Sequence, residues 1–154
     1  MSSPHDVPSS IPPPAAPPPY GPPISLEAAR RVMAAAEAEA AAHRWPMVIA
    51  IVDSGAHLVM LHRMDQANLG AVPVCQRKAV TAVSFRRATK VFEDLLVAGG
   101  AGIRLLTFGP ELIAVEGGVP LLDGGRVIGA IGVSGMQSSQ DGQVAVAGAR
   151  ALGG

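Results

Sequence analysis

The fold is decided by the stretch MVIAIVDSGAHLVMLHR, residues 47–63. Branched and other apolar residues fill Met47–Asp53, Ser54-Gly55 is a tight-turn signal, and His57–Arg63 repeats the apolar pattern. The pattern predicts two antiparallel strands joined in a hairpin. Both strands are apolar on both faces, whereas an antiparallel sheet normally has one face in water. We therefore expect this sheet to be covered on both sides, by helices or by a second subunit.

Helical periodicity flanks the hairpin on both sides. Upstream, Ser25 is placed to cap a helix whose apolar residues recur at helical spacing, and Pro46 marks its end. Downstream, a second helix is expected over Pro73–Phe85, because proline is favoured in a first helical turn. A short third helix is expected over Thr89–Leu96, with its threonine as N-cap.

A second hairpin is expected near the C-terminus. Its strands are Val119–Leu122 and Arg126–Val133, and the sequence Asp-Gly-Gly at 123–125 forms the turn. Before it, Ile103–Phe108 and Glu111–Val115 are expected to be short extended or irregular segments.

A last helix is expected over Gln143–Leu152, with Asp141 as its cap. The order is therefore helix, two strands, two helices, two or three strands, helix. This mixture predicts an α+β fold, with a central antiparallel sheet of about five strands flanked by helices on both faces.

The chain has 154 residues, which fits one domain. Residues 1–23 hold most of the prolines, so they are expected to form a disordered, polyproline-like tail before a domain over residues 24–154. The tail is either a ligand for a proline-binding module or a passive segment, and the passive interpretation is favoured.

Charge and cysteine content exclude several classes of function. The formal net charge is zero, so we expect no nucleic-acid partner and no membrane partner, while self-association is not opposed by repulsion. The single cysteine, Cys75, excludes an intramolecular disulfide and a cysteine-based metal cluster within one chain. With no secretory signal recognised, a cytoplasmic location is expected.

Several short motifs follow one another along the chain. They are Val52-Asp53-x-Gly55, Arg63-Met64-Asp65, Lys78-Ala79-x-Thr81-Ala82-x-x-Phe85, Gly117-Gly118-Val119-Pro120, the run Gly129–Gly135 and Gln140-Asp141. Together, over Ser25–Leu152, they resemble the GlcG/HbpS family, which includes the C-terminal domain of PduO. The resemblance implies a profilin-like sandwich, homo-oligomers and members that bind haem. The sequence departs from the family pattern at residues 66–70, beside the expected pocket.

The candidate ligand-binding residues combine charge with glycines. They are Arg63, Asp65, Lys78, Thr81, Glu116, Gly117, Gly118 and Asp141. We expect a pocket between the second helix and the sheet, with Arg63, Asp65 and Lys78 at its rim. Arginine and lysine would capture an anion such as a haem propionate, and the glycines would let the backbone approach the ligand. The alternatives are a local ion pair, a lysine whose stem covers apolar surface, and simple turn geometry.

Two further groups of residues receive structural interpretations. The basic cluster Arg77, Lys78, Arg86, Arg87 and Lys90 is taken as a solvated helix face, because few aromatic residues are available to stack on bases.

The histidines His57 and His62 are an odd number of residues apart and face opposite sides of a strand, so they cannot hold one metal together. No metal site is expected. The family resemblance makes haem the candidate cofactor; a single histidine could be its axial ligand, although a packed or solvated role is favoured for each histidine.

Three hypotheses of function follow. The first is a homo-oligomeric binding protein for haem or another small anionic ligand. The second is a cofactor-independent enzyme of small organic-acid or aromatic catabolism, with Asp65 or Glu116 as proton carrier. The third is an assembly module whose proline-rich arm recruits partners.

Overall fold

The computed structural model describes residues 15–153, so the expectation for the first part of the tail lies outside the described residues. Helices and strands follow the order α1 (Leu26–Ala42), β1 (Val48–Asp53), β2 (Leu58–Arg63), α2 (Ala71–Phe85), α3 (Thr89–Ala98), the 3-10 helix η1 (Gly100–Thr107), β3 (Gly118–Asp123), β4 (Arg126–Ser134) and α4 (Ser138–Arg150).

One sheet of four strands forms the centre, in the order β2-β1-β4-β3. All neighbouring strands are antiparallel: Ile49 pairs with His62 on one side and with Val133 on the other. The expected α+β fold with an antiparallel sheet is confirmed, but the expected number of about five strands is too high.

Across the described residues between α3 and β3 the structure has no strand, although a further strand was possible there. The sequence predicts an extended or irregular segment over Ile103–Phe108, but residues Gly100–Thr107 form the helix η1 instead. Local bonds close its turns, including Gly102 N to Gly99 O and Phe108 N to Leu105 O, each 3.1 Å. Apolar content alone does not distinguish such a short helix from a short strand.

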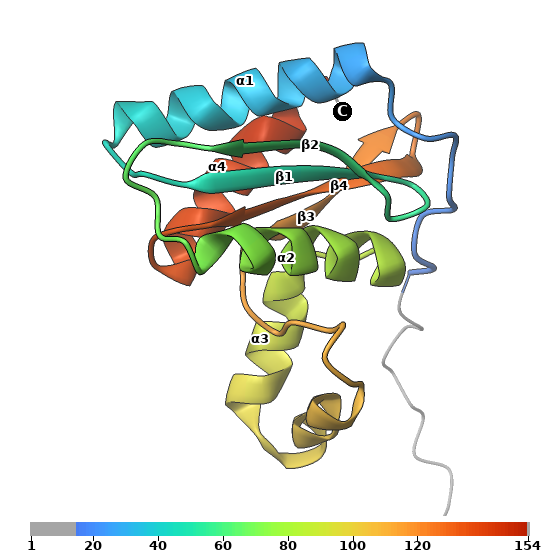
Figure 1. Ribbon diagram of the computed structural model, residues 1–154. Coiled ribbons are helices and arrows are strands. Elements are labelled where there is room, and N and C mark those ends of the chain that lie inside the picture. Colours follow the sequence, from blue (N-terminus) through green and yellow to red (C-terminus); the bar gives the residue numbers. More distant parts are fainter. Residues whose placement is uncertain (1–14, 154) are drawn as a thin grey trace, which may run out of the picture.

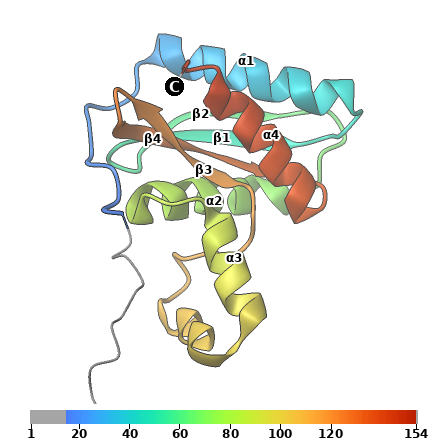
Figure 2. The same ribbon diagram turned by 180° about the vertical axis from the view of Figure 1, so that it is seen from behind.

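Helices cover both faces of the sheet (Figures 1 and 2). Helices α1 and α4 pack side by side on one face, and α2 lies across the other. A Cβ on Gly148 of α4 would lie 3.2 Å from Cβ of Ala36, so small residues let α1 and α4 approach closely. Helices of the same chain cover both faces of β1, whereas the edge strand β2 is only partly buried, so the expectation that both faces are covered is confirmed for the first strand of the hairpin alone.

Helix α2 rests directly on the backbone of β4. A Cβ on Gly132 would lie 1.9 Å from the carbonyl oxygen of Cys75, a distance that no side chain can occupy. Gly132 therefore serves close packing, because its lack of a side chain lets α2 lie directly on the strand.

Two helix starts differ from the expectation. Thr89 is the first residue of α3, and its hydroxyl bonds to Gly118 instead of capping the helix. Helix α4 begins at Ser138, where Gln137 and Gln140 form a reciprocal capping pair, so Asp141 lies inside the first turns and is not the cap.

The N-terminal segment is part of the packed domain from about Pro17 onward. Pro19 O accepts a bond from Val127 N, Gly21 N donates to Val127 O, and Ile24 N donates to Ile128 O, each 2.9 Å. These bonds attach the segment before α1 to the first residues of β4. No helix within residues 15–153 has the length and apolar character needed to cross a membrane.

Candidate functional site

A buried ion pair joins α2 to α4. Lys78 is 1% exposed, and its Nζ donates to Asp141 Oδ2 and to Val133 O, each at 2.9 Å. The second oxygen of Asp141 accepts from Met136 N at 3.0 Å. Burial raises the pKa of Asp141, while the neighbouring ammonium opposes that shift. Every polar atom of the pair is therefore bonded inside the protein.

Two glycines seal this pair from solvent. A Cβ on Gly117 would lie 2.5 Å from Val133 O and 2.8 Å from Lys78 Nζ. A Cβ on Gly118 would lie 2.4 Å from Lys78 O, and Gly118 N donates to Thr89 Oγ1 at 2.8 Å. The backbone of this loop thus lies directly against Lys78.

Four predicted site residues, Lys78, Gly117, Gly118 and Asp141, are thus brought together as a structural centre, which we call the Lys78 node. The expectation that the Lys78 ammonium lies at a pocket rim is wrong, because the amine is fully enclosed and paired. The lysine side chain points into the protein because Asp141 of α4, which is distant in the sequence, supplies a buried carboxylate.

Thr81 has an anchoring role. Its hydroxyl donates to Glu111 O and accepts from Ile113 N, both at 3.1 Å. The residue therefore fixes the irregular segment after η1 against α2.

Glu116 lies beside the Lys78 node but faces a different space. It is half-buried, 3.8 Å from Lys90 Nζ, and its carboxylate lies against Gly142. It lines a polar groove of about 470 Å³ together with Glu39 and Arg150.

Arg63 and Asp65 do not meet Lys78. Both are exposed, and Asp65 lines a shallow depression beside Trp45 at the end of α1 that contains neither of the other two residues. The expected convergence of Arg63, Asp65 and Lys78 at one pocket is therefore wrong.

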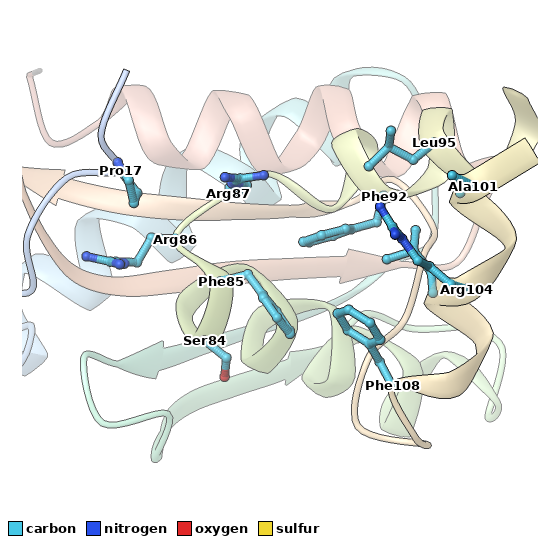
Figure 3. A pocket seen from close by; sticks show the side chains of 12 residues that line it. Pro17, Ser84, Phe85, Arg86, Arg87, Phe92, Leu95, Ala101, Arg104 and Phe108 are labelled. Carbon is cyan, nitrogen blue, oxygen red and sulfur yellow. The ribbon is translucent and has the colours of Figure 1, made fainter. Parts of the chain in front are cut away.

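The structure reveals a different cleft, between the C-terminal end of α2, α3 and η1 (Figure 3). Its volume is about 490 Å³, within the usual range for small-molecule pockets. All three phenylalanines of the chain line it: Phe85, Phe92 and Phe108. Phe85 meets Phe92 edge to face at 5.2 Å between ring centres, and meets Phe108 at 6.1 Å.

Three arginines line the same space, and we call it the Phe–Arg cleft. Arg86 and Arg87 follow α2, and Arg104 comes from η1. Within the described part of the chain, the side chains of Arg87 and Arg104 make no hydrogen bond or ion pair, and no acidic residue lines the cleft. The cleft therefore combines an apolar floor with uncompensated positive charge.

The basic cluster predicted as a solvated face is thus divided among several roles. Lys78 is buried, Arg77 donates to Pro110 O, and Lys90 pairs with Asp94. Only the remaining two members, Arg86 and Arg87, belong to the cleft.

The cleft fits part of a haem group. Its rings and guanidinium groups suit a flat macrocycle with carboxylate arms. Its lining includes no histidine, cysteine, methionine or tyrosine that could bind the iron. Each of His43, His57 and His62 has a ring nitrogen beside a carboxylate, and none lines the cleft. Across residues 15–153, no cluster of three or more His, Cys, Asp or Glu side chains could hold a metal ion.

Known proteins of similar sequence share this domain. The protein GlcG of Escherichia coli K12 is 40% identical over 111 residues, which cover 72% of this chain and 81% of GlcG. The corrinoid adenosyltransferase PduO of Salmonella typhimurium is 32% identical over 102 residues, 65% of this chain but only 30% of PduO.

Solved structures match over most of the chain. The Klebsiella pneumoniae protein ORFY has a TM-score of 0.80 at 28% identity and covers 86% of this chain and 92% of its own. A double mutant of HbpS from Streptomyces reticuli scores 0.78 at 30% identity, covering 87% and 90%. A complex of PduOC with haem scores 0.75 at 27% identity, covering 84% and 94%.

The family model described as "Haem degrading protein HbpS-like" matches residues 24–150. Its match begins two residues before the first helix and ends with α4, so it covers the sheet and every helix described above. This chain belongs to the HbpS-like family.

Proposed function

We propose that this chain is a homo-oligomeric binding protein for a small anionic ligand with a flat aromatic body, and that the Phe–Arg cleft is its site. The observation that carries the proposal is the meeting of all three phenylalanines with Arg87 and Arg104 in one cleft.

Each half of the cleft favours a different part of such a ligand. Aromatic faces and edges give a flat ring more than area burial alone, about 0.5–1.5 kcal/mol per pair. A guanidinium binds a carboxylate through two parallel hydrogen bonds, which fixes its orientation. Phe92 is buried, whereas Phe85 and Phe108 are more than one third exposed, so a ligand would cover apolar surface that now faces water.

Haem is the largest candidate for this site. Support comes from the haem complex of PduOC, a structural neighbour. In this cleft the arginines would hold its propionates, and an iron ligand would have to come from elsewhere. Smaller aromatic acids need no such ligand, so the rings and arginines that line the cleft supply the contacts that they require.

The oligomeric part of the proposal rests on the outer surface of α3 and η1. Val97, Leu106 and Ile103 are 82%, 68% and 61% exposed. Exposed apolar residues grouped on one projecting element are typical of interaction surfaces. A second copy of the chain would cover them.

The proposal is tested by titrating the full chain with 2-naphthoate, protoporphyrin IX and haemin, with the neutral analogue 2-naphthalenemethanol for comparison. In Arg87→Ala, the affinity for 2-naphthoate should fall about tenfold, because a charge-assisted bond is lost. Arg31→Ala, an exposed arginine of α1, is the matched control and should bind as the wild type does.

Two results would contradict the proposal. One is equal binding of 2-naphthoate by Arg87→Ala and the wild type, and the other is no binding of any anion by either. Tighter binding of haemin than of protoporphyrin IX would reveal an iron ligand outside the cleft. Light scattering on the same samples should give a mass above that of one chain, and a monomer would refute self-association.

The enzyme hypothesis retains support at both of its candidate proton carriers. Glu116 shares its polar groove with Arg150, so a carboxylate and an anion anchor lie in one space. Asp65 likewise shares its shallow depression with an arginine, Arg44. Turnover of an organic acid that is lost in Glu116→Gln or in Asp65→Asn would move this alternative to first place.

A further inference from the structure

The segment Pro17–Gly21, which we call the strap, crosses the end of α2 beside the Phe–Arg cleft. Backbone bonds of Pro19 and Gly21 to both polar groups of Val127 hold it beside the first residues of β4. Pro17 is one of the residues that line the cleft. A segment expected to be a passive tail therefore contributes to the candidate site.

Tyr20 fastens the strap to the end of α2. Its hydroxyl lies 2.8 Å from Val83 O and 3.0 Å from Ser84 O. Carbonyl groups in the last turn of a helix lack partners within the helix, so an external donor is favourable there. The tyrosine supplies that donor although it is 45% exposed.

Arg86 fastens the strap from the other side. Its guanidinium carbon lies 5.0 Å from the centre of the Tyr20 ring, and its Nη1 donates to Pro18 O at 3.3 Å. Figure 3 shows this side chain beside Pro17 and directed away from the three phenylalanine rings. Arg86 thus holds the strap, whereas Arg87 next to it makes no such contact within the described residues.

Arg86 also has an unusual backbone conformation. Its φ is +54°, in the left-handed region, which is unfavourable for residues other than glycine. This conformation ends α2, and the side chains of Arg86 and Arg87 therefore point in different directions. One arginine is thereby available to the strap and the next to a ligand.

Building on the proposed function, we propose that the strap is one wall of the binding site and controls ligand exchange. Tyr20 and Arg86 are positioning residues that hold Pro17 at the mouth of the cleft. With the strap fastened, a bound aromatic acid contacts an additional apolar wall and leaves slowly. With the strap released, the mouth opens and the wall contact is lost.

The test measures association and dissociation of 2-naphthoate by stopped-flow fluorescence on the full chain. In Tyr20→Phe, which keeps the ring and removes the hydroxyl, dissociation should become about three to ten times faster, the effect of one lost hydrogen bond. Association should also become faster, by a smaller factor. General destabilisation of the site would not accelerate both steps.

A double-mutant cycle tests whether Tyr20 and Arg86 both act by holding the strap. Arg86→Ala should accelerate dissociation to a similar extent, and the Tyr20→Phe/Arg86→Ala variant should gain less than the product of the two effects, because both act through one strap. In the ligand-free protein, the amides of Gly21 and Val127 should exchange hydrogen faster in each variant. Arg87→Ala is the control, with weaker binding and unchanged exchange of these amides.

The outcomes separate the strap from the site. If Arg87→Ala weakens binding but Tyr20→Phe and Arg86→Ala release the probe at the wild-type rate, the strap proposal is overturned and the binding site stands. If the wild type does not bind 2-naphthoate, or if Arg87→Ala binds it as well as the wild type does, both proposals fall.

Discussion

Two cationic side chains near the same helix, Lys78 and Arg87, lie in opposite environments. Lys78 is enclosed, and both a carboxylate and a carbonyl accept from it at 2.9 Å. Arg87 has no side-chain partner within the described residues and lies beside an apolar floor. A charge that is fully paired inside the protein stabilises one arrangement of the chain, whereas an unpaired charge beside apolar surface remains available to a ligand.

The largest effect is expected from breaking the Lys78 node. Lys78→Met should lower the free energy of unfolding by about 3–5 kcal/mol, because Asp141 is left buried without its cation. Denaturant titration followed by circular dichroism measures the change.

The control removes both charges at once. In Lys78→Met/Asp141→Asn the amide oxygen can still accept from Met136 N, so this variant should be more stable than Lys78→Met alone. A loss below about 1 kcal/mol in the single variant, typical of an exposed pair, would show that the node is open to water.

A smaller loss is expected from filling the space beside the node. In Gly118→Ala the new methyl would lie 2.4 Å from Lys78 O and 2.7 Å from Thr89 Cγ2, so overpacking should cost about 1–3 kcal/mol. Gly70→Ala is the matched control, since nothing lies within 4 Å of its added carbon and its φ of −63° suits alanine. Equal stability of the two variants would contradict the close approach of this loop to α2.

The sequence predicts the frame of this molecule better than its site. The two hairpins follow from apolar runs bounded by turn residues, and α1 and α2 follow from helical spacing, because these signals are local. The burial of Lys78 depends on a carboxylate 63 residues later, which no local pattern contains.

The Phe–Arg cleft was missed for a related reason. Its rings come from α2, α3 and the end of η1. The glycines around η1 allow many backbone conformations, so the sequence does not predict that η1 folds back toward α2. One signal was available: all three phenylalanines of a chain with 3% aromatic residues fall within 24 residues of one another, next to Arg86 and Arg87. The strap was missed because its prolines suggested a tail, whereas Tyr20 is the residue that fastens it.

The smallest effect on the fold is expected from the cleft. In Arg104→Ala the free energy of unfolding should change by no more than about 0.5 kcal/mol, because the side chain is exposed and makes no hydrogen bond or ion pair within the described residues. Its affinity for 2-naphthoate should nevertheless fall about tenfold, as for other charge-assisted contacts.

The reactivity of Cys75 can compare the Lys78 node and the Phe–Arg cleft in one experiment. Burial raises the pKa of its thiol to about 12, so at pH 8 only about one thiol in ten thousand is ionised, against roughly a quarter of free thiols with a pKa near 8.5. Because the reagent cannot reach a fully buried thiol, labelling with iodoacetamide requires the protein to open and should be much slower than in the unfolded chain. Lys78→Met should accelerate labelling, since a less stable protein opens more often. Arg104→Ala should label at the wild-type rate, and faster labelling would show that the cleft supports the interior and is not a separate binding surface.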